Sequence, residues 1–224
     1  MVGSGQGVMH AEAGQIRAGM ERFGLVADDA RLVAMLQHLE AVRKWAKTYN
    51  LVARGDLEAL VARHLLDALA IHQWVPSGRM LDVGSGAGFP GIPLAIVRSD
   101  VKVCLVDSVG KRVRFLRHVV RQLSLQNIEV AQSRVEDFDA REPFDAIVCR
   151  AFASLSDFMA LTRHVAGPRC RFLAIKGRYP EAELKDLPDW VRVDSVEKYD
   201  VPDLHATRHL VIMSISSLAG RMGD

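Results

Sequence analysis

The stretch that decides the fold reads Met80-Leu81-Asp82-Val83-Gly84-Ser85-Gly86-Ala87-Gly88-Phe89-Pro90-Gly91-Ile92-Pro93. A short apolar run leads into three glycines at alternating positions, followed by a proline suited to a first helical turn. Glycines permit a tight turn and let a ligand approach the backbone, while the first amides of a helix have no internal partner. The pattern therefore predicts a strand, a ligand-binding turn and a helix.

Short apolar runs and helical patterns alternate after this stretch. Runs typical of strands occupy residues 80–83, 101–106, 128–131, 146–149 and 172–175, and helical patterns occupy residues 92–98, 111–123 and 155–165. This alternation predicts a parallel sheet with helices on both faces. Two further runs, 191–196 and 209–215, have no convincing helical pattern near the end of the chain, so we expect the last strand to run antiparallel.

The amino-terminal third has a different character. Apolar side chains recur every three or four residues from Leu32 to Tyr49, and a second helical pattern begins near Asp56 and ends by Pro76. Residues 1–19 contain five glycines and almost no large apolar side chain, which predicts a flexible tail. We therefore divide the chain into a tail (1–19), a helical segment (20–76), an α/β domain (77–217) and a carboxyl-terminal tail (218–224).

Composition places the chain among globular proteins and excludes disordered and collagen-like classes, since 49% of its 224 residues are hydrophobic and 25% are charged. The net charge is only +2, but residues 79–178 carry +6 and residues 179–224 carry −4. No apolar run predicts a membrane span or a signal peptide. Three cysteines lie in strand-like runs without metal-ligand spacing, so we expect reduced thiols, no metal and a cytoplasmic protein.

The residues around the glycine turn indicate which nucleoside it binds. Asp107 lies at the end of the second strand, nineteen residues after Gly88, where a carboxylate can accept hydrogen bonds from both ribose hydroxyls. Phe89 stands where the dinucleotide fingerprint has its third glycine, and the charge of Asp82 would repel phosphates but tolerate a sulfonium group. S-adenosylmethionine is thus favoured over NAD, although a dehydrogenase remains an alternative.

The helix predicted over residues 111–123 has one strongly basic face. Lys111, Arg114, Arg117, His118 and Arg121 fall within about one third of its circumference, and residues 109–121 contain no acid. Such a face favours contact with nucleic-acid phosphates over a merely solvated surface. We expect further RNA contacts from three residues that follow or lie near strand ends, namely Arg134, Lys176 and Arg208.

Several segments in combination resemble one family. They are residues 82–96, 107–116, 132–136 and 150–154, together with 44–51, 63–67, 176–177 and 208–210. Over about residues 22–215 the chain resembles the bacterial small-subunit rRNA guanine-N7 methyltransferases, also called the glucose-inhibited division protein B family. The resemblance implies a Rossmann-like class I S-adenosylmethionine-dependent methyltransferase fold, with a seven-stranded, mostly parallel sheet and an amino-terminal helical extension. It also implies methylation of a guanine N7 in the 530 loop of 16S rRNA, free or within the 30S subunit.

We expect two groups of site residues. The glycine turn and the strand-end carboxylate predict cofactor contacts from Gly84, Gly86 and Asp107. The resemblance implies cofactor contacts from Gly84, Phe89, Val135, Glu136 and Arg150. Positioning of the target guanine is predicted from Arg150, Lys176 and Arg208. Because the N7 lone pair is free at neutral pH, its attack on a methyl group needs alignment rather than deprotonation, and we expect no catalytic base.

Two other functions compete with this prediction. A small-molecule methyltransferase would explain the glycine turn and Asp107, but not the acid-free basic helix. A non-catalytic RNA-binding assembly module would explain the helix, but would not require all the cofactor residues. In each case we expect the chain to act as a monomer.

Overall fold

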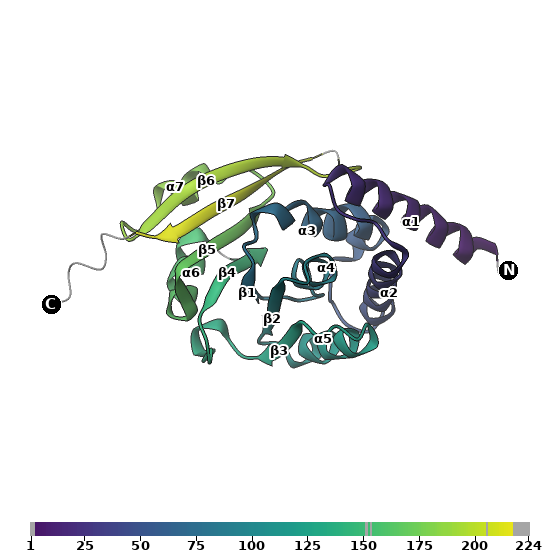
Figure 1. The fold of residues 1–224 in the computed structure, drawn as a ribbon, viewed down its shortest axis with the longest axis horizontal. Coiled ribbons are helices and arrows are strands. Elements are labelled where there is room, and N and C mark those ends of the chain that lie inside the picture. The colour runs from purple at the N-terminus through teal and green to yellow at the C-terminus, as the bar shows by residue number, and fades with distance from the viewer. Residues whose placement is uncertain (1–2, 151, 153, 205, 217–224) are drawn as a thin grey trace.

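The computed structural model describes residues 3–150, 152, 154–204 and 206–216. These residues form one seven-stranded sheet in the order β3-β2-β1-β4-β5-β7-β6 (Figure 1). The strands are β1 (Gly78–Val83), β2 (Val101–Asp107), β3 (Ile128–Gln132), β4 (Phe144–Arg150), β5 (Ala166–Lys176), β6 (Val191–Asp200) and β7 (Thr207–Ile215). The first five pair in parallel, and β7 runs antiparallel to both of its neighbours. The predicted mostly parallel sheet and the antiparallel last strand are confirmed.

Helices cover both faces of the sheet. They are α4 (Gly91–Val97), α5 (Gly110–Gln122), α6 (Leu155–Thr162) and the short α7 (Glu181–Lys185). Figure 1 shows α6 and α7 on one side of the sheet and α4 and α5 on the other. The apolar side of α5 buries Phe115, Leu116 and Val119 completely, which is the amphipathic arrangement that its sequence pattern predicts. Sequence analysis missed α7, whose five residues bury no side chain.

The helical segment adds a second layer over α4 and α5. Helix α2 (Asp29–Ala46) begins after Asp28, whose carboxylate caps it by accepting a hydrogen bond from the Arg31 amide. The second predicted helix is instead four short pieces: a 3-10 helix (Arg54–Ala59), a π-helix (Val61–Leu66), α3 (Asp67–Ala70) and another 3-10 helix (His72–Trp74). Their buried side chains join one apolar core with the sheet, so this segment is an integral part of the fold.

Residues 3–19 are not a flexible tail, and this prediction was wrong. They belong to helix α1 (Gly3–Arg22), in which Ile16 and Met20 are completely buried. Gly19 faces Leu66 so closely that any side chain there would overlap it. The helix is held by this packing rather than by its own glycine-rich sequence, and such stabilisation cannot be read from local propensity. Residues 1 and 2, and the carboxyl-terminal tail predicted at 218–224, lie outside the described residues.

Candidate cofactor and RNA site

The glycine turn lies where the strand order reverses. Strands β1 and β4 are neighbours but connect to strands on opposite sides, and ligands of such sheets bind in the crevice outside these carboxyl ends. Gly84, Gly86 and Gly88 have φ angles of +68°, +57° and +83°, a backbone region that favours glycine. A side chain at Gly84 would meet nothing within 4 Å, whereas one at Gly88 would strike Ile92. The turn is therefore open at its start and closely packed at its end.

Asp82 supports this turn from inside the protein. Its Oδ2 accepts a hydrogen bond from the Gly91 amide at 2.9 Å, at the beginning of α4, and its Oδ1 has no hydrogen-bond partner among the described residues. Burial raises the pKa of Asp82 to about 7. The expectation that Asp82 presents a full negative charge to the ligand needs correction, because the carboxyl is buried beneath the turn and partly protonated at neutral pH.

Asp107 links the glycine turn to the next helix. Its Oδ2 accepts a hydrogen bond from the Gly86 amide at 3.0 Å, and its Oδ1 accepts one from the Val109 amide at 2.8 Å. The guanidinium of Arg112 lies 3.5 Å from the same carboxylate. Each carboxylate oxygen has two lone pairs, so these contacts leave acceptor capacity for ribose hydroxyls. The backbone contacts of Asp107 are a second role that sequence analysis did not predict.

The ring of Phe89 packs inside the protein. It lies between His38 and His64, with ring-centroid distances of 4.7 and 5.3 Å, and the residue is only 6% exposed. Burial lowers the pKa of His38 to about 4, so its neutral ring donates from Nε2 to the Ala87 carbonyl at 2.8 Å. Helix α2 thus holds the turn in place. The buried ring of Phe89 anchors the turn from inside the protein.

The remaining predicted cofactor residues follow β3 and β4. Val135 is buried and Glu136 exposed in a short 3-10 helix (Val135–Asp137), which lies near Asp107 because β2 and β3 are paired. Arg134 is exposed and lies 3.8 Å from the Glu136 carboxylate. At the end of β4, the Nη1 atom of Arg150 is buried without a hydrogen-bond partner among the residues that the structure describes. Such an atom has donor capacity for a ligand carboxylate or phosphate.

A buried carboxylate, Asp67, lies close to Arg150. The Tyr199 hydroxyl donates a hydrogen bond to Asp67 Oδ1 at 3.1 Å, and Arg208 Nε lies 3.4 Å from the same oxygen. Burial raises the pKa of Asp67, while the charges of Arg150 and Arg208 act in the opposite direction. Sequence analysis did not assign Asp67 or Tyr199 to the site. The one available signal was a carboxylate within an otherwise apolar helical run.

Lys176 and Arg208 lie on opposite faces of the sheet. On β5, Lys176 shares a face with Phe172 and Ala174, which pack toward α6. On β7, Arg208 shares a face with Leu210 and Ile212, which pack toward the amino-terminal helices. The Lys176 ammonium contacts both carboxylate oxygens of Glu183 on α7, at 2.7 and 3.0 Å. The structure therefore brings Arg150 and Arg208 near one carboxylate, but does not bring Lys176 into the same cluster.

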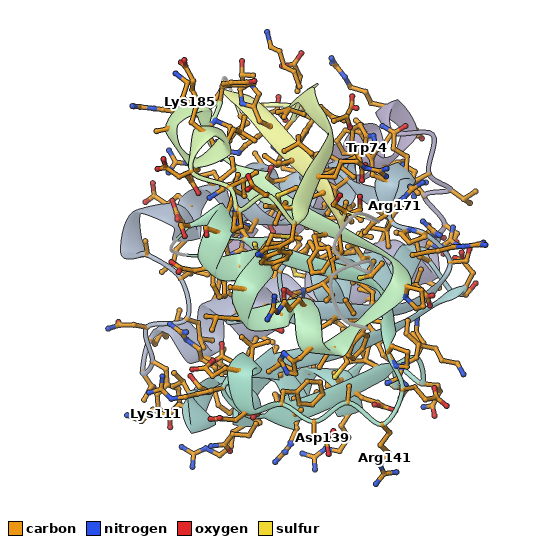
Figure 2. All side chains as sticks on the ribbon, turned by 90° about the vertical axis from the view of Figure 1, so that its left-hand side faces the viewer. Trp74, Lys111, Asp139, Arg141, Arg171 and Lys185 are labelled. Carbon is orange, nitrogen blue, oxygen red and sulfur yellow. The ribbon has the colours of Figure 1, made fainter. Side chains whose placement is uncertain are left out.

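Helix α5 presents the predicted basic face to solvent. Lys111, Arg114, Arg117 and Arg121 are exposed, and within the described part of the chain none of the four is ion-paired. Figure 2 shows Lys111 on the opposite side of the molecule from Trp74 and Arg171. Lys111 follows the carboxyl end of β2, whereas Arg171 is the central residue of β5. The basic face thus begins at the edge that holds the glycine turn.

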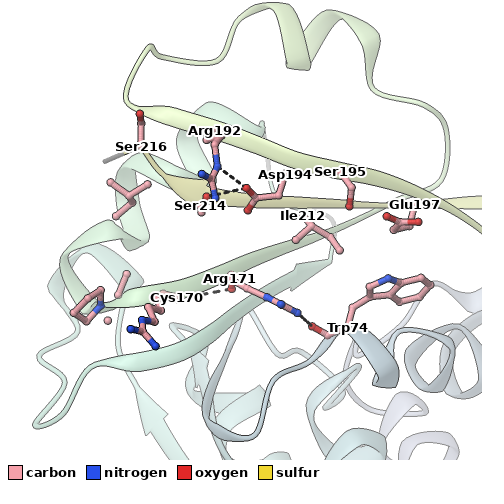
Figure 3. Close-up of a pocket in the computed structure, with 15 residues that line it drawn as sticks. Trp74, Cys170, Arg171, Arg192, Asp194, Ser195, Glu197, Ile212, Ser214 and Ser216 are labelled. Atoms are coloured by element: carbon pink, nitrogen blue, oxygen red, sulfur yellow. Dashed lines mark hydrogen bonds and ion pairs between the residues drawn. The ribbon is translucent and has the colours of Figure 1, made fainter. Parts of the chain in front are cut away.

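A cavity of about 1050 Å³ lies away from this edge (Figure 3). It is bounded by Trp74, the first half of β5 and the two antiparallel strands. Asp194 accepts a hydrogen bond from Arg192 at 2.6 Å, and Arg171 donates to the Trp74 carbonyl at 3.5 Å. This cavity contains none of the predicted site residues. Among the described residues no helix is long and apolar enough to cross a membrane, and no group of potential metal ligands is found.

Comparisons with known proteins agree on one family. A family model described as rRNA small subunit methyltransferase G matches residues 31–211. A ribosomal RNA small subunit methyltransferase G of Pectobacterium carotovorum is 46% identical over 191 residues, which cover 85% of this chain and 93% of the relative. Its counterpart in Shigella flexneri is 43% identical over 195 residues, covering 87% and 94%. A solved methyltransferase of Aquifex aeolicus shares the fold, with a TM-score of 0.52, 22% identity and coverage of 69% and 92%.

Proposed function

The chain belongs to the rRNA small subunit methyltransferase G family, and from this premise we propose its reaction. It transfers the methyl group of S-adenosylmethionine to N7 of a guanine in the 530 loop of 16S rRNA. The observation that carries this proposal is the open glycine turn after β1 beside the buried Nη1 of Arg150 at the end of β4, which has no hydrogen-bond partner among the described residues. The basic face of α5, whose four exposed cations form no ion pair in the described part of the chain, begins at the same edge. The proposal places the reaction in the cytoplasm, with the chain acting as a monomer.

The residues of the crevice fit S-adenosylmethionine. Space in front of Gly84 admits a ligand against the backbone, with Gly86 next to it, and Asp107 retains lone pairs for the ribose hydroxyls. Val135 and Glu136 would bound the adenine, because they follow the strand paired with β2. The buried Nη1 of Arg150 would take the cofactor carboxylate. Phe89 would contribute through the turn that its buried ring anchors.

The chemistry requires alignment more than proton transfer. Bound S-adenosylmethionine supplies an electrophilic methyl group on a sulfonium. The N7 lone pair forms the new N–C bond while the C–S bond breaks, its electron pair stays on sulfur, and the positive charge moves to the guanine. No proton leaves N7, so the protein must hold the base in line with the methyl group. We assign this positioning to Arg150 and Arg208, which lie on the same face of the sheet and near the same carboxylate, Asp67.

RNA binding is assigned to the carboxyl edge and its basic helix. Four cations in one row, which form no ion pair with any described residue, are available to backbone phosphates: Lys111, Arg114, Arg117 and Arg121. Arg134 lies on the same edge, after β3. Lys176 is assigned a weaker contribution, since Glu183 already neutralises its charge. Free rRNA and the 30S subunit both present such phosphates.

The test is methyl transfer from radiolabelled S-adenosylmethionine to 30S subunits and to free 16S rRNA from cells lacking this enzyme. The proposal expects label in small-subunit RNA, and mapping of the product should locate it at N7 of a 530-loop guanine. Cofactor binding without label in any RNA would overturn the proposal and leave an assembly module. Label in small molecules alone would favour the small-molecule methyltransferase.

A further inference from the structure

A second, smaller cavity lies between the end of α2 and the beginning of α5. Its volume is about 280 Å³. The residues that line it are Thr48, Tyr49, Asn50, Leu51, Val109, Lys111 and Arg112. Two of these residues are cations and none is a carboxylate, so the cavity is suited to a ligand with negative charge.

An aromatic row borders this cavity. The ammonium of Lys111 lies over the ring of Tyr49, 5.6 Å from its centroid. The same ring lies 5.6 Å from Trp45, which in turn lies 5.5 Å from His118 on α5. Aromatic rings beside a row of cations are the arrangement that binds single-stranded nucleic acids, with bases on the rings and phosphates on the cations.

The cavity adjoins the proposed cofactor site. Arg112 lines the cavity and lies 3.5 Å from Asp107, the carboxylate assigned to the ribose. On its other side the cavity continues into the basic face of α5, since Lys111 belongs to both. A strand that follows the basic helix toward the crevice would therefore pass this cavity.

We propose that the cavity binds one unpaired nucleotide of the RNA substrate, with its base stacked on Tyr49 and its phosphate held by Lys111. This inference rests on the proposed function, which it extends by one nucleotide subsite. The base replaces the ammonium over the ring. Stacking of a base on an aromatic ring is generally stronger than contact between a solvated ammonium and the ring, so the exchange is favourable. The ammonium released from the ring then meets a phosphate.

The experiment compares binding of a fluorescently labelled RNA hairpin carrying the 530 loop with binding of S-adenosylmethionine alone. Tyr49→Leu should weaken RNA binding about 5- to 150-fold, as lost stacking predicts, and leave cofactor affinity near wild type. The melting temperature is measured alongside, because Tyr49 is half-buried and packs against the core. Tyr49→Phe should restore RNA binding, because stacking needs the ring and not the hydroxyl. Lys111→Gln should reduce the slope of log affinity against log salt by about 1, whereas Tyr49→Leu should not change it.

Arg163 and Trp190 provide the matched control. The Arg163 guanidinium lies 5.1 Å from the centroid of the Trp190 ring, so the two form a cation–ring pair of the same kind. Trp190 packs against the apolar side chains between the sheet and α6. Arg163→Gln should leave RNA affinity unchanged.

Two results would overturn the inference. One is RNA affinity of Tyr49→Leu equal to that of wild type. The other is a loss of S-adenosylmethionine affinity with unchanged RNA affinity, which would assign the cavity to the cofactor. Failure of the proposed function is a separate outcome, because it requires that the wild-type protein itself methylates no RNA.

Discussion

The Tyr199 hydroxyl donates a hydrogen bond to the carboxylate of Asp67 across 3.1 Å. Tyr199 lies near the end of β6 and Asp67 begins α3, so the bond joins the amino-terminal helices to the antiparallel part of the sheet. Arg208 on β7 contacts the same carboxylate, and the charge of Arg150 on β4 acts on it. Asp67 thus ties together elements that hold both arginines of the proposed target site.

Removing either partner of this bond should destabilise the protein. Tyr199→Phe should lower the free energy of unfolding by about 1–3 kcal/mol, because the hydrogen bond has a charged acceptor. Asp67→Asn should cost about 3 kcal/mol or more, since it leaves two arginines beside a neutral amide in a buried site. Urea unfolding of both variants and wild type tests this order. A stability of Asp67→Asn equal to wild type would contradict it.

The raised pKa of Asp82 predicts a specific dependence of stability on pH. Its pKa is about 7 in the folded protein and about 3.9 in an unfolded chain, so the folded state binds more protons between these values. The contribution of Asp82 to stability is therefore fully present below pH 4 and is lost as the pH rises to 7. Asp82→Asn removes this titration and can still accept from the Gly91 amide.

The measurement is the difference in unfolding free energy between Asp82→Asn and wild type across pH 4 to 7. As the pH rises, the variant should become more stable relative to wild type. Other titrating groups are common to both proteins and cancel. A difference that is independent of pH would show that the carboxyl titrates in the ordinary range.

Two glycines of the turn should respond differently to alanine. Gly84→Ala adds a methyl group in open space, so it should cost only about 1–2 kcal/mol of backbone strain while lowering S-adenosylmethionine affinity about tenfold. Gly88→Ala should destabilise by a further 1–3 kcal/mol or so, because its methyl group overlaps Ile92. Calorimetric titration and urea unfolding separate the two effects. Equal cofactor affinity for Gly84→Ala and wild type would argue against ligand contact at Gly84.

Helix α1 should contribute measurably to stability. Ile16→Ala and Met20→Ala each remove a completely buried side chain and should lower the free energy of unfolding by about 2–5 kcal/mol. Val8→Ala is the matched control on the same helix, since Val8 is 57% exposed, and should change stability by less than about 0.5 kcal/mol. If all three variants unfold at the urea concentration of wild type, α1 is not packed as described.

Charge reversal on α5 should separate RNA binding from cofactor binding. The double variant Arg114→Glu, Arg117→Glu should weaken RNA binding strongly and more so at low salt, because both side chains are exposed and neither is ion-paired where the structure describes the chain. Its affinity for S-adenosylmethionine should remain that of wild type. The control variant Arg141→Glu, Arg169→Glu reverses two exposed charges away from the carboxyl edge, and its RNA affinity should change little. Unchanged RNA affinity of the α5 variant at two salt concentrations would refute the assignment.

The regular parts of the fold could be predicted because they depend on local patterns. Short apolar runs, apolar repeats with a helical period and the glycine turn all lie within short stretches of sequence. The basic face of α5 was predictable for the same reason, since helical periodicity alone places its arginines together. Helix α1 was not predictable, because Ile16 and Met20 are ordered by packing against residues far along the chain.

The sequence by itself determined the strand–turn–helix with its glycines, the alternation that builds the sheet, and the position of Asp107 at a strand end. Only the tertiary structure decided how residues distant in sequence meet. It buried Phe89 between two histidines, placed Asp67 beside Tyr199 and Arg208, and put Lys176 on the opposite face with Glu183. Local patterns follow from the geometry of a few neighbouring residues, whereas these contacts depend on strand order and on which face each side chain occupies.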